Sequence, residues 1–476
     1  MSPERSVSAE ERAAGNPLGY QPIGRLLLNF SIPSVISMLV NSIYNIVDQI
    51  FIGQGVGELG NAATTVSFPM VTIMLAFATL IGSGGSAYAA LKLGEGKNEE
   101  ADRTLNNVFV MALGAGALLL AAGLLFLEPM LRVFGAGEAV MPYAKDYASI
   151  LLLGAPFNMM GIALSNMART DGSPRLSMYG ILIGAILNTV LDPIYIFVFH
   201  WGVKGAAVAT ITSQIISAVI LLAYFATRSR HMRFRLSAMR PEGSIWGRVA
   251  SLGISAGITQ AVSVIMQIVM NNSLLYYGSR SEVGAVTAQA AMGIVMKVAM
   301  ILLAFCIGIG VGAQPILGFN RGARKFHRVK GAYLRAVAAA TVAVTLGWLL
   351  CQTIPHVILS LFGSASPAFT DFAVRSMRIY LFGIFCAGFQ VVSTNYFQAT
   401  GQPLKASLLS MLRQLLLLIP LLLILPLFWG LDGILYAGPI ADLSSGVIVA
   451  LFILPEMRKL DRQVQEEDTR AAASRR

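Results

Sequence analysis

Charged residues are scarce in this chain. Asp, Glu, Lys and Arg make up 12% of its 476 residues, about half of the roughly 25% found in an average soluble domain. Hydrophobic residues make up 55% of the chain, and the mean hydropathy is +0.68. This balance excludes an ordinary soluble domain and indicates a membrane protein. The apolar segments do not alternate with polar positions as barrel strands would, so the spans are expected to be helices.

Cysteine and histidine are rare, and neither type forms a cluster. The three cysteines, Cys306, Cys351 and Cys386, stand far apart in apolar segments, which offers neither a disulfide framework nor a metal site. The four histidines lack the spacing of a zinc or haem site. We therefore expect no cofactor apart from a coupling ion, and packing roles for the cysteines.

Two signals of other protein classes are missing. Residues 1–26 lack the apolar core and the small-residue cleavage site of a signal peptide, and we interpret them as a cytoplasmic tail. The chain also has no Gly-x-x-x-x-Gly-Lys loop, and its polar parts are too short for an ATPase domain. Any transport by such a protein would draw its energy from a gradient.

Twelve apolar segments are each long enough to cross a hydrocarbon core of about 30 Å as a helix. We place them at 27–52, 62–91, 104–127, 139–167, 175–199, 203–227, 246–276, 283–316, 328–353, 366–397, 403–427 and 430–455. With the N-terminus inside, the inner segments hold 27 of the 35 Lys and Arg residues and the outer segments hold six. The positive-inside rule then puts both termini in the cytoplasm, with the spans in the plasma (inner) membrane. The net charge of +11 serves this orientation and contact with membrane lipid, so no nucleic-acid partner is expected.

The second half of the chain repeats the first after about 226–229 residues. Asn166 and the run 171–174 (Asp-Gly-Ser-Pro), for example, correspond to Asn395 and the run 400–403 (Thr-Gly-Gln-Pro). Six spans per half make this a parallel repeat. The sequence thus predicts an all-α membrane protein with two six-helix lobes. Its parts are an N-terminal tail (1–26), an N-lobe (27–227), a basic cytoplasmic linker (228–245), a C-lobe (246–455) and a cytoplasmic C-terminal tail (456–476).

Polar residues interrupt the fifth span. Asn188 and Asp192 are four residues apart, so a helix places them on one face, and Pro193 removes a backbone donor beside them. A charge in mid-membrane costs roughly 2.5–3.5 kcal/mol on insertion scales, so such an acid usually faces a cavity and handles ions or protons. The alternative is a structural acid that is tied to a neighbouring helix.

The first span has a polar stripe down one face, which we expect to line a cavity. It consists of Ser37, Asn41, Tyr44, Asn45 and Asp48. Pro33 gives the same helix a place to bend. The alternative is a stripe that is satisfied against the neighbouring helix.

Small and polar residues elsewhere complete this pattern. Thr210 lies in the sixth span, and glycines at 82, 84 and 85 match glycines at 308, 310 and 312, where we expect close helix packing first and gating second. The C-half has amides but no carboxylate in its first and fourth spans. We predict that Gln267, Asn271 and Gln289 orient a bound compound. For Lys297 and Asp442 the simplest expectation is that they neutralise each other.

These features together resemble the multidrug and toxic compound extrusion (MATE) family over almost the whole chain outside the tails. The motifs that carry the resemblance are the run from Pro33 to Asp48, Lys92-Leu93-Gly94-Glu95-Gly96, Asn188 to Pro193, the run 314–323 (QPILGFNRGA), and Gln398-Ala399-Thr400-Gly401. The resemblance implies a V-shaped antiporter that expels lipophilic, often cationic compounds in exchange for Na⁺ or H⁺.

The resemblance also implies a coupling site. The family's N-lobe acid, its Asn–Asp pair and its Thr match Asp48, Asn188, Asp192 and Thr210, which makes these four residues a possible Na⁺ site. Spans seven and ten lack the acids of the sodium-coupled branch, so this chain looks more like the DinF-like branch. Asn41 and Tyr44 join the three C-half amides as predicted substrate-cavity residues, and a monomer is expected.

Two other functions remain open on the sequence. A flippase for lipid-linked saccharides shares the two-lobe plan, but its phosphorylated cargo demands several basic residues in the cavity, and only Lys297 and Arg413 lie within spans. An intramembrane enzyme would need clustered acids, or His and Cys on facing helices. Asp48 and Asp192 imitate an aspartyl pair, but no second motif supports hydrolysis. The sequence therefore favours a transporter over an enzyme.

Overall fold

The computed structural model describes residues 16–56, 58–134, 136–235, 238–360 and 367–473, and this part of the chain is almost entirely helical. Eleven of its helices are long and apolar enough to cross a membrane. A twelfth span is a helix pair, Phe369–Tyr380 and Ile384–Ala399, that bends by 42° at a short break. The prediction of twelve helical spans is confirmed. Most of the predicted N-terminal tail lies outside the described residues, as does the side chain of Asn45.

The N-lobe contains the first six spans. Its elements are η1 (Pro17–Gly19), α2 (Ile23–Val56), α3 (Glu58–Gly94), α4 (Asn98–Leu125), α5 (Leu127–Val133), α6 (Met141–Thr170), α7 (Pro174–Pro193), the π-helical turn η2 (Ile194–Val198) and α8 (Gly202–Thr227). The π-helical turn directly follows Pro193, whose missing N–H breaks the α-helical ladder there.

The C-lobe contains the other six spans. Its elements are α9 (Gly243–Gly278), α10 (Ala285–Gly322), α11 (Phe326–Thr353), α12 (Pro355–Ser360), α13 (Pro367–Tyr380), η4 (Ile384–Cys386), α14 (Ala387–Ala399), α15 (Pro403–Met411), the π-helical η5 (Leu412–Leu418), α16 (Ile419–Trp429) and α17 (Leu431–Ala473). Helix α17 continues well past residue 455, through most of the stretch that was predicted as a tail.

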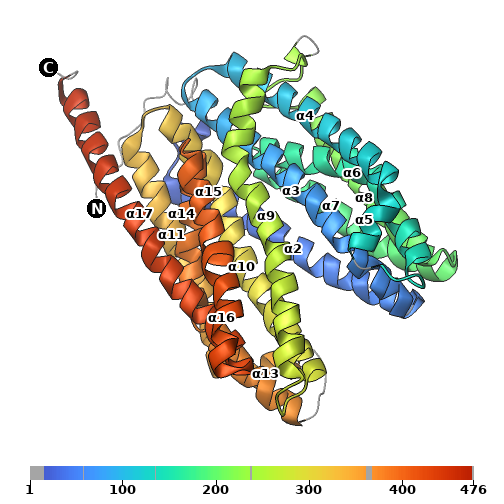
Figure 1. The fold of residues 1–476 in the computed structure, drawn as a ribbon. Helices are drawn as coiled ribbons and strands as arrows, with labels where there is room; N and C mark the ends of the chain where they lie inside the picture. Colours follow the sequence, from blue (N-terminus) through green and yellow to red (C-terminus); the bar gives the residue numbers. More distant parts are fainter. Residues whose placement is uncertain (1–15, 57, 135, 236–237, 361–366, 474–476) are drawn as a thin grey trace.

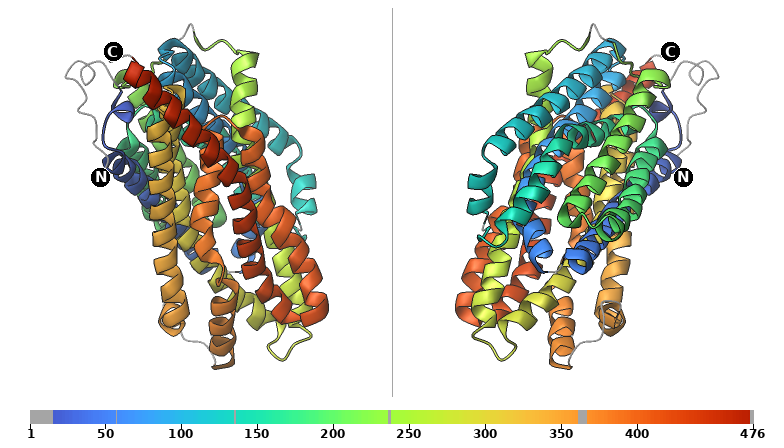
Figure 2. Two further views of the ribbon diagram at one scale, coloured as in Figure 1. Left: turned by 90° about the vertical axis from the view of Figure 1, so that its left-hand side faces the viewer. Right: turned by 90° about the vertical axis from the view of Figure 1, so that its right-hand side faces the viewer.

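The two lobes meet at one end of the molecule and diverge toward the other (Figure 1). Both termini and the segment between α8 and α9 lie at the closed end, which we call the termini side (Figures 1 and 2). The opposite end is the far side. Between the lobes, α3 packs on α9 and α10 packs on α2. The molecule is therefore V-shaped.

Glycines allow the lobes to touch backbone to backbone. A Cβ atom on Gly253 of α9 would lie 1.8 Å from the carbonyl oxygen of Leu80, and one on Gly84 of α3 would lie 2.0 Å from that of Val249. On the other pair, a Cβ atom on Gly312 of α10 would lie 2.7 Å from Cα of Ser31 in α2. The expected packing role of these glycines is confirmed, and it lies between the lobes.

The same contacts recur inside each lobe, as the internal repeat requires. A Cβ atom on Gly82 would lie 2.8 Å from Nδ2 of Asn166, and one on Gly310 would lie 2.7 Å from Nδ2 of Asn395. Each of these asparagines donates to the carbonyl group four residues before it. The alignment of Asn166 with Asn395 therefore holds in three dimensions.

The segment between the lobes is bound to the N-lobe by its backbone. Asp171 is fully buried and accepts hydrogen bonds from the N–H groups of Arg230, His231 and Met232 at 2.7–2.8 Å. Asp102 accepts a further bond from the N–H of Arg233 at 2.8 Å. Residues 230–233 are thus part of the N-lobe surface rather than a free hinge.

The entry to α2 is bound to the opposite lobe in the reverse sense. Asn320 and Arg328 of the C-lobe donate to the carbonyl oxygen of Leu18 at 3.0 and 3.1 Å, and Lys325 donates to that of Gly19 at 2.9 Å. Each lobe therefore holds the segment that leads into the other lobe's first helix. These two attachments, 16–21 on the C-lobe and 230–235 on the N-lobe, are called the straps below.

We expect Gly253→Ala to weaken the closure of the termini side, because the new methyl group would overlap the Leu80 carbonyl. The thermal midpoint of the purified protein in detergent should fall by several degrees. Gly247→Ala is the matched control on the same helix, since its Cβ atom would meet nothing within 4 Å. Equal midpoints for the two variants would show that this contact does not hold the lobes together.

We expect Asp171→Ala to release the linker strap, because four donors, including the Tyr224 hydroxyl, would lose their acceptor. The loss should be at least about 3 kcal/mol of unfolding free energy. Hydrogen exchange at residues 230–232 should become faster than in the wild type. Unchanged exchange at these three amides would contradict the strap.

Candidate functional site

The predicted coupling residues of the fifth and sixth spans meet inside the N-lobe. Helix α7 packs on α8, and the amide of Asn188 donates to Oδ1 of Asp192 at 3.3 Å and to Oγ1 of Thr210 at 3.4 Å. Asp192 is fully buried and Asn188 is nearly so. Because Thr210 gives its own proton to the Ala206 carbonyl at 3.0 Å, its oxygen lone pairs face the site.

Asp48 brings a second carboxyl group to the same place from α2, which packs on α7. Asp48 and Asp192 are close enough to share a side-chain hydrogen bond. Two carboxylates at this separation cannot both remain ionised without a proton or another cation between them. The structure thus brings together the four residues Asp48, Asn188, Asp192 and Thr210.

Three buried oxygen atoms of this group have no hydrogen-bond partner. They are Oδ1 of Asp48, Oδ1 of Asn188 and Oδ2 of Asp192. All three are acceptors, and hard cations such as Na⁺ prefer carboxylate and amide oxygens. The donor set therefore fits a small cation as well as a shared proton.

A tyrosine that the sequence analysis missed belongs to this site. Tyr147 of α6 is 8% exposed, and its hydroxyl is close enough to interact electrostatically with Asp48, Tyr44 and Asp192. A lone tyrosine in an apolar span carries no pattern, so only the packing of α6 could reveal it. Its hydroxyl can donate to a carboxylate when the site is charged.

The predicted cavity residues lie on both lobes. Asn41 of α2 is exposed, and Tyr44 is half-buried one turn from Asp48. On α9, Gln267 and Asn271 are exposed, and on α10 Gln289 donates to the Asn271 carbonyl at 3.2 Å. Asn271 lies 18 residues, or about five turns, after the interface residue Gly253, so it continues the side of α9 that faces the N-lobe.

The polar residues of the tenth span are structural instead. The Nε2 of buried Gln390 donates to the Asp442 carbonyl at 2.7 Å, and Ser393 bonds the Tyr333 hydroxyl at 2.8 Å. Asn395 packs against Gly310. These side chains hold the C-lobe together rather than lining the space between the lobes.

The expectation that Lys297 and Asp442 neutralise each other is wrong. Asp442 forms its ion pair with Arg413, which projects from the π-helical η5. The rotation of the π-helical turn decides which side chain faces α17, and the sequence does not show that rotation. Lys297 is exposed on α10, and no ion pair to it occurs among the described residues.

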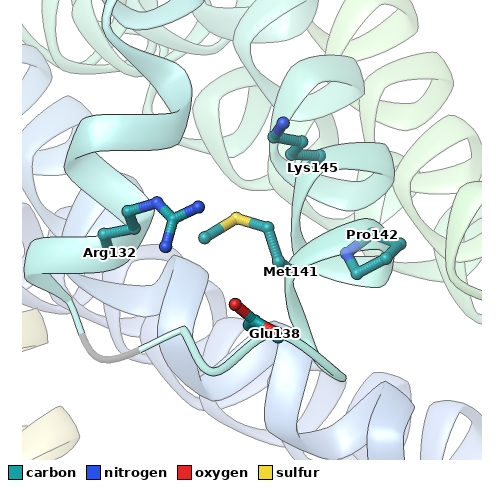
Figure 3. A pocket seen from close by; sticks show the side chains of 5 residues that line it. All are labelled: Arg132, Glu138, Met141, Pro142 and Lys145. Atoms are coloured by element: carbon teal, nitrogen blue, oxygen red, sulfur yellow. The ribbon is translucent and has the colours of Figure 1, made fainter.

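A separate hollow lies on the N-lobe between α5 and α6 (Figure 3). It has a volume of about 390 Å³ and is lined by Arg132, Glu138, Met141, Pro142 and Lys145. Arg132 and Lys145 both pair with Glu128. The hollow contains none of the predicted site residues, so it is not the candidate site.

Twelve apolar helices in two diverging lobes, with a carboxyl pair enclosed in one of them, define a multi-pass membrane transporter. The family model MatE matches residues 33–194 and 256–424. The chain belongs to the MATE family of multidrug and toxic compound extrusion transporters, and its resemblance to that family is confirmed.

Curated relatives and solved structures agree with this family. The chain is 26% identical to the multidrug export protein MepA of Staphylococcus haemolyticus over 92% of this chain and 94% of the relative. It is 25% identical to MepA of Staphylococcus aureus strain MRSA252 over the same shares. The structure of the MATE multidrug transporter DinF-BH in complex with a dye matches with a TM-score of 0.83 at 32% identity, covering 90% of this chain and 95% of that one.

An outward-facing structure of a MATE family transporter has the same fold. The TM-score is 0.87 at 22% identity, and the match covers 96% of this chain and all of the other chain. The prediction of a V-shaped, two-lobe architecture is therefore confirmed.

We expect Asp48→Asn and Asp192→Asn each to leave a folded protein, because removing a buried charge lowers the cost of membrane insertion. Each variant should reduce gradient-driven export of a cationic dye from proteoliposomes to the background rate. Asp146→Asn is the control, since this N-lobe acid forms a surface ion pair with Lys204 at 3.2 Å. Wild-type export with intact ion dependence in either of the two variants would remove that residue from the coupling site.

Proposed function

We propose that this protein is a secondary antiporter that exports lipophilic, often cationic compounds in exchange for Na⁺ or H⁺. The observation that carries the proposal is the contact between the carboxyl groups of Asp48 and Asp192. An enclosed acid pair must hold a proton or a cation, and it becomes negative when that ion leaves. A site of this kind can exchange one positive charge for another.

On this proposal the ion and the exported compound compete for the same charge. A bound ion neutralises the pair and favours one bend of α2 at Pro33, while a cationic compound prefers the negative site. Asn188 and Thr210 supply neutral oxygens to the ion. The family membership, the drug-export relatives and the dye complex of DinF-BH support the compound class.

The two lobes alternate access by rocking as rigid bodies, on this account, with the termini side in the cytoplasm of the plasma membrane. The backbone contacts of Gly84 and Gly253 would open while the far side closes. The straps support a hinge after residue 235, since residues 230–235 are bound to the N-lobe. A monomer supplies both walls of the path.

The competing functions have less support from the geometry. A flippase for lipid-linked saccharides requires several basic side chains for phosphate groups, yet Arg413 is committed to Asp442. An enzyme would place substrate against the acid pair, and the family and its named relatives are transporters.

The test is export of a cationic dye from proteoliposomes in which the Na⁺ and pH gradients are imposed separately. We expect one of the two gradients to drive export and the other to have no effect. Export that needs neither gradient, or that needs ATP, would overturn the proposal.

We expect Gln267→Ala to change which compounds are exported while the ion requirement stays the same. An amide can orient a ligand but cannot change charge, and Gln267 is exposed on α9 of the C-lobe, far along the chain from the acid pair. The measurement is a comparison of several dyes under each gradient. A lost or switched ion requirement would move this residue into the coupling machinery.

A further inference from the structure

Lys297 is the one cationic side chain of α10 away from its end on the termini side, where Arg321 lies. It sits 12 residues from the far end of the helix, or about 18 Å along the axis. Its side chain is exposed, and among the described residues it forms no ion pair. The other embedded cation of the C-lobe, Arg413, is neutralised by Asp442. Lys297 is therefore a charge for which the described part of the folded chain gives no partner.

The position of Lys297 on α10 shows which way it faces. Gly308 lies 11 residues, or about three turns, further along the helix, so the two residues share one side. A Cβ atom on Gly308 would lie 2.5 Å from Cα of Val35 in α2. The side that packs on the N-lobe at the termini side is thus the side that presents Lys297 where the lobes diverge. Met300 and Ile307 on the same side are 44% and 38% exposed.

Open space adjoins Lys297 on this side. Gly293 lies one turn away, and a Cβ atom built on it would meet nothing within 4 Å. One turn further is Gln289, which is bonded to the Asn271 carbonyl. Gln289, Gly293 and Lys297 therefore form a row at four-residue spacing, with an amide at one end, a side-chain-free gap in the middle and an ammonium group at the other end.

The charges of the two lobes are opposite across this space. The N-lobe contributes the acid pair Asp48 and Asp192, whereas α9 and α10 contribute only Lys297 between their ends. A lysine is a compact point charge with three donors, which matches a singly charged carboxylate better than a phosphate, for which arginine forks are preferred.

We propose that Lys297 and the gap at Gly293 form a subsite for a carboxylate group of the exported compound. The transporter then accepts zwitterionic compounds, with the cationic end toward the N-lobe acids and the carboxylate on the C-lobe at Lys297. Gln289 offers the carboxylate a second donor or a bridging position. This inference rests on the proposed export function and names a substrate class for it.

The test uses a matched pair of rhodamine dyes, a cationic methyl ester and the corresponding free acid, which has a carboxylate in place of the ester. The dissociation constant of each dye is measured on purified full-length protein by fluorescence anisotropy. For the wild type we expect measurable binding of both dyes. In Lys297→Gln the preference should shift toward the ester by about tenfold, which is the loss of one charge-assisted hydrogen bond.

Three further variants make the result specific. Lys297→Arg should keep the wild-type preference, because the charge remains. Gly293→Leu should shift the preference toward the ester, because its side chain fills the gap without touching the charge. Met300→Gln, on the same exposed side, should leave the ratio of the two constants within about twofold, since no charge changes.

The outcomes separate this inference from the proposed function. Wild-type protein that exports the ester but does not bind the acid would overturn the carboxylate subsite while export stands. Equal weakening of both dyes in Lys297→Gln would also overturn it and assign the lysine a structural role. A wild-type protein that exports neither dye under any gradient would contradict the proposed function itself.

Discussion

The contact between the carboxyl groups of Asp48 and Asp192 is the constraint on which the rest of this structure depends. Two like charges about 4 Å apart repel by about 4 kcal/mol at an effective dielectric constant of about 20, and burial adds a desolvation cost. The lobe must therefore either neutralise the pair or attract a cation to it. Three unpartnered oxygens beside the pair, from Asp48, Asn188 and Asp192, have the same requirement. On the proposed mechanism this unsatisfied charge is what couples an ion to an exported compound.

The packing between the lobes gives that local event a large readout. Glycine contacts on the termini side bring backbones of α3 and α9 together, and the two straps bind each lobe to the segment that enters the other. Packed backbones of this kind have discrete arrangements rather than a continuous range. A change in the bend of α2, which contributes both Asp48 and a contact with α10, would therefore favour one arrangement of the whole molecule over another.

Much of the fold could be predicted from the sequence, because a lipid environment leaves few choices. Apolar runs of sufficient length must be helices, and the repeat of Asn166 in Asn395 shows two equivalent lobes. The residues Asp48, Asn188, Asp192 and Thr210 stood out because polar groups in apolar spans are costly. Tyr147 did not stand out, and the partner of Asp442 was wrong, because both depend on how helices rotate against each other. The straps use backbone N–H and C=O groups of irregular segments, which leave no sequence pattern.

The most direct measurement is calorimetric and potentiometric titration of the purified protein with a cationic dye at stepped pH and Na⁺ concentration. The account predicts that each bound dye displaces about one proton or one Na⁺ from the acid pair, so that affinity falls as the competing ion rises. This displacement should vanish when Asp48 and Asp192 are both replaced by Asn. Dye binding that releases no ion, and whose affinity is the same at every pH and Na⁺ concentration, would contradict the account.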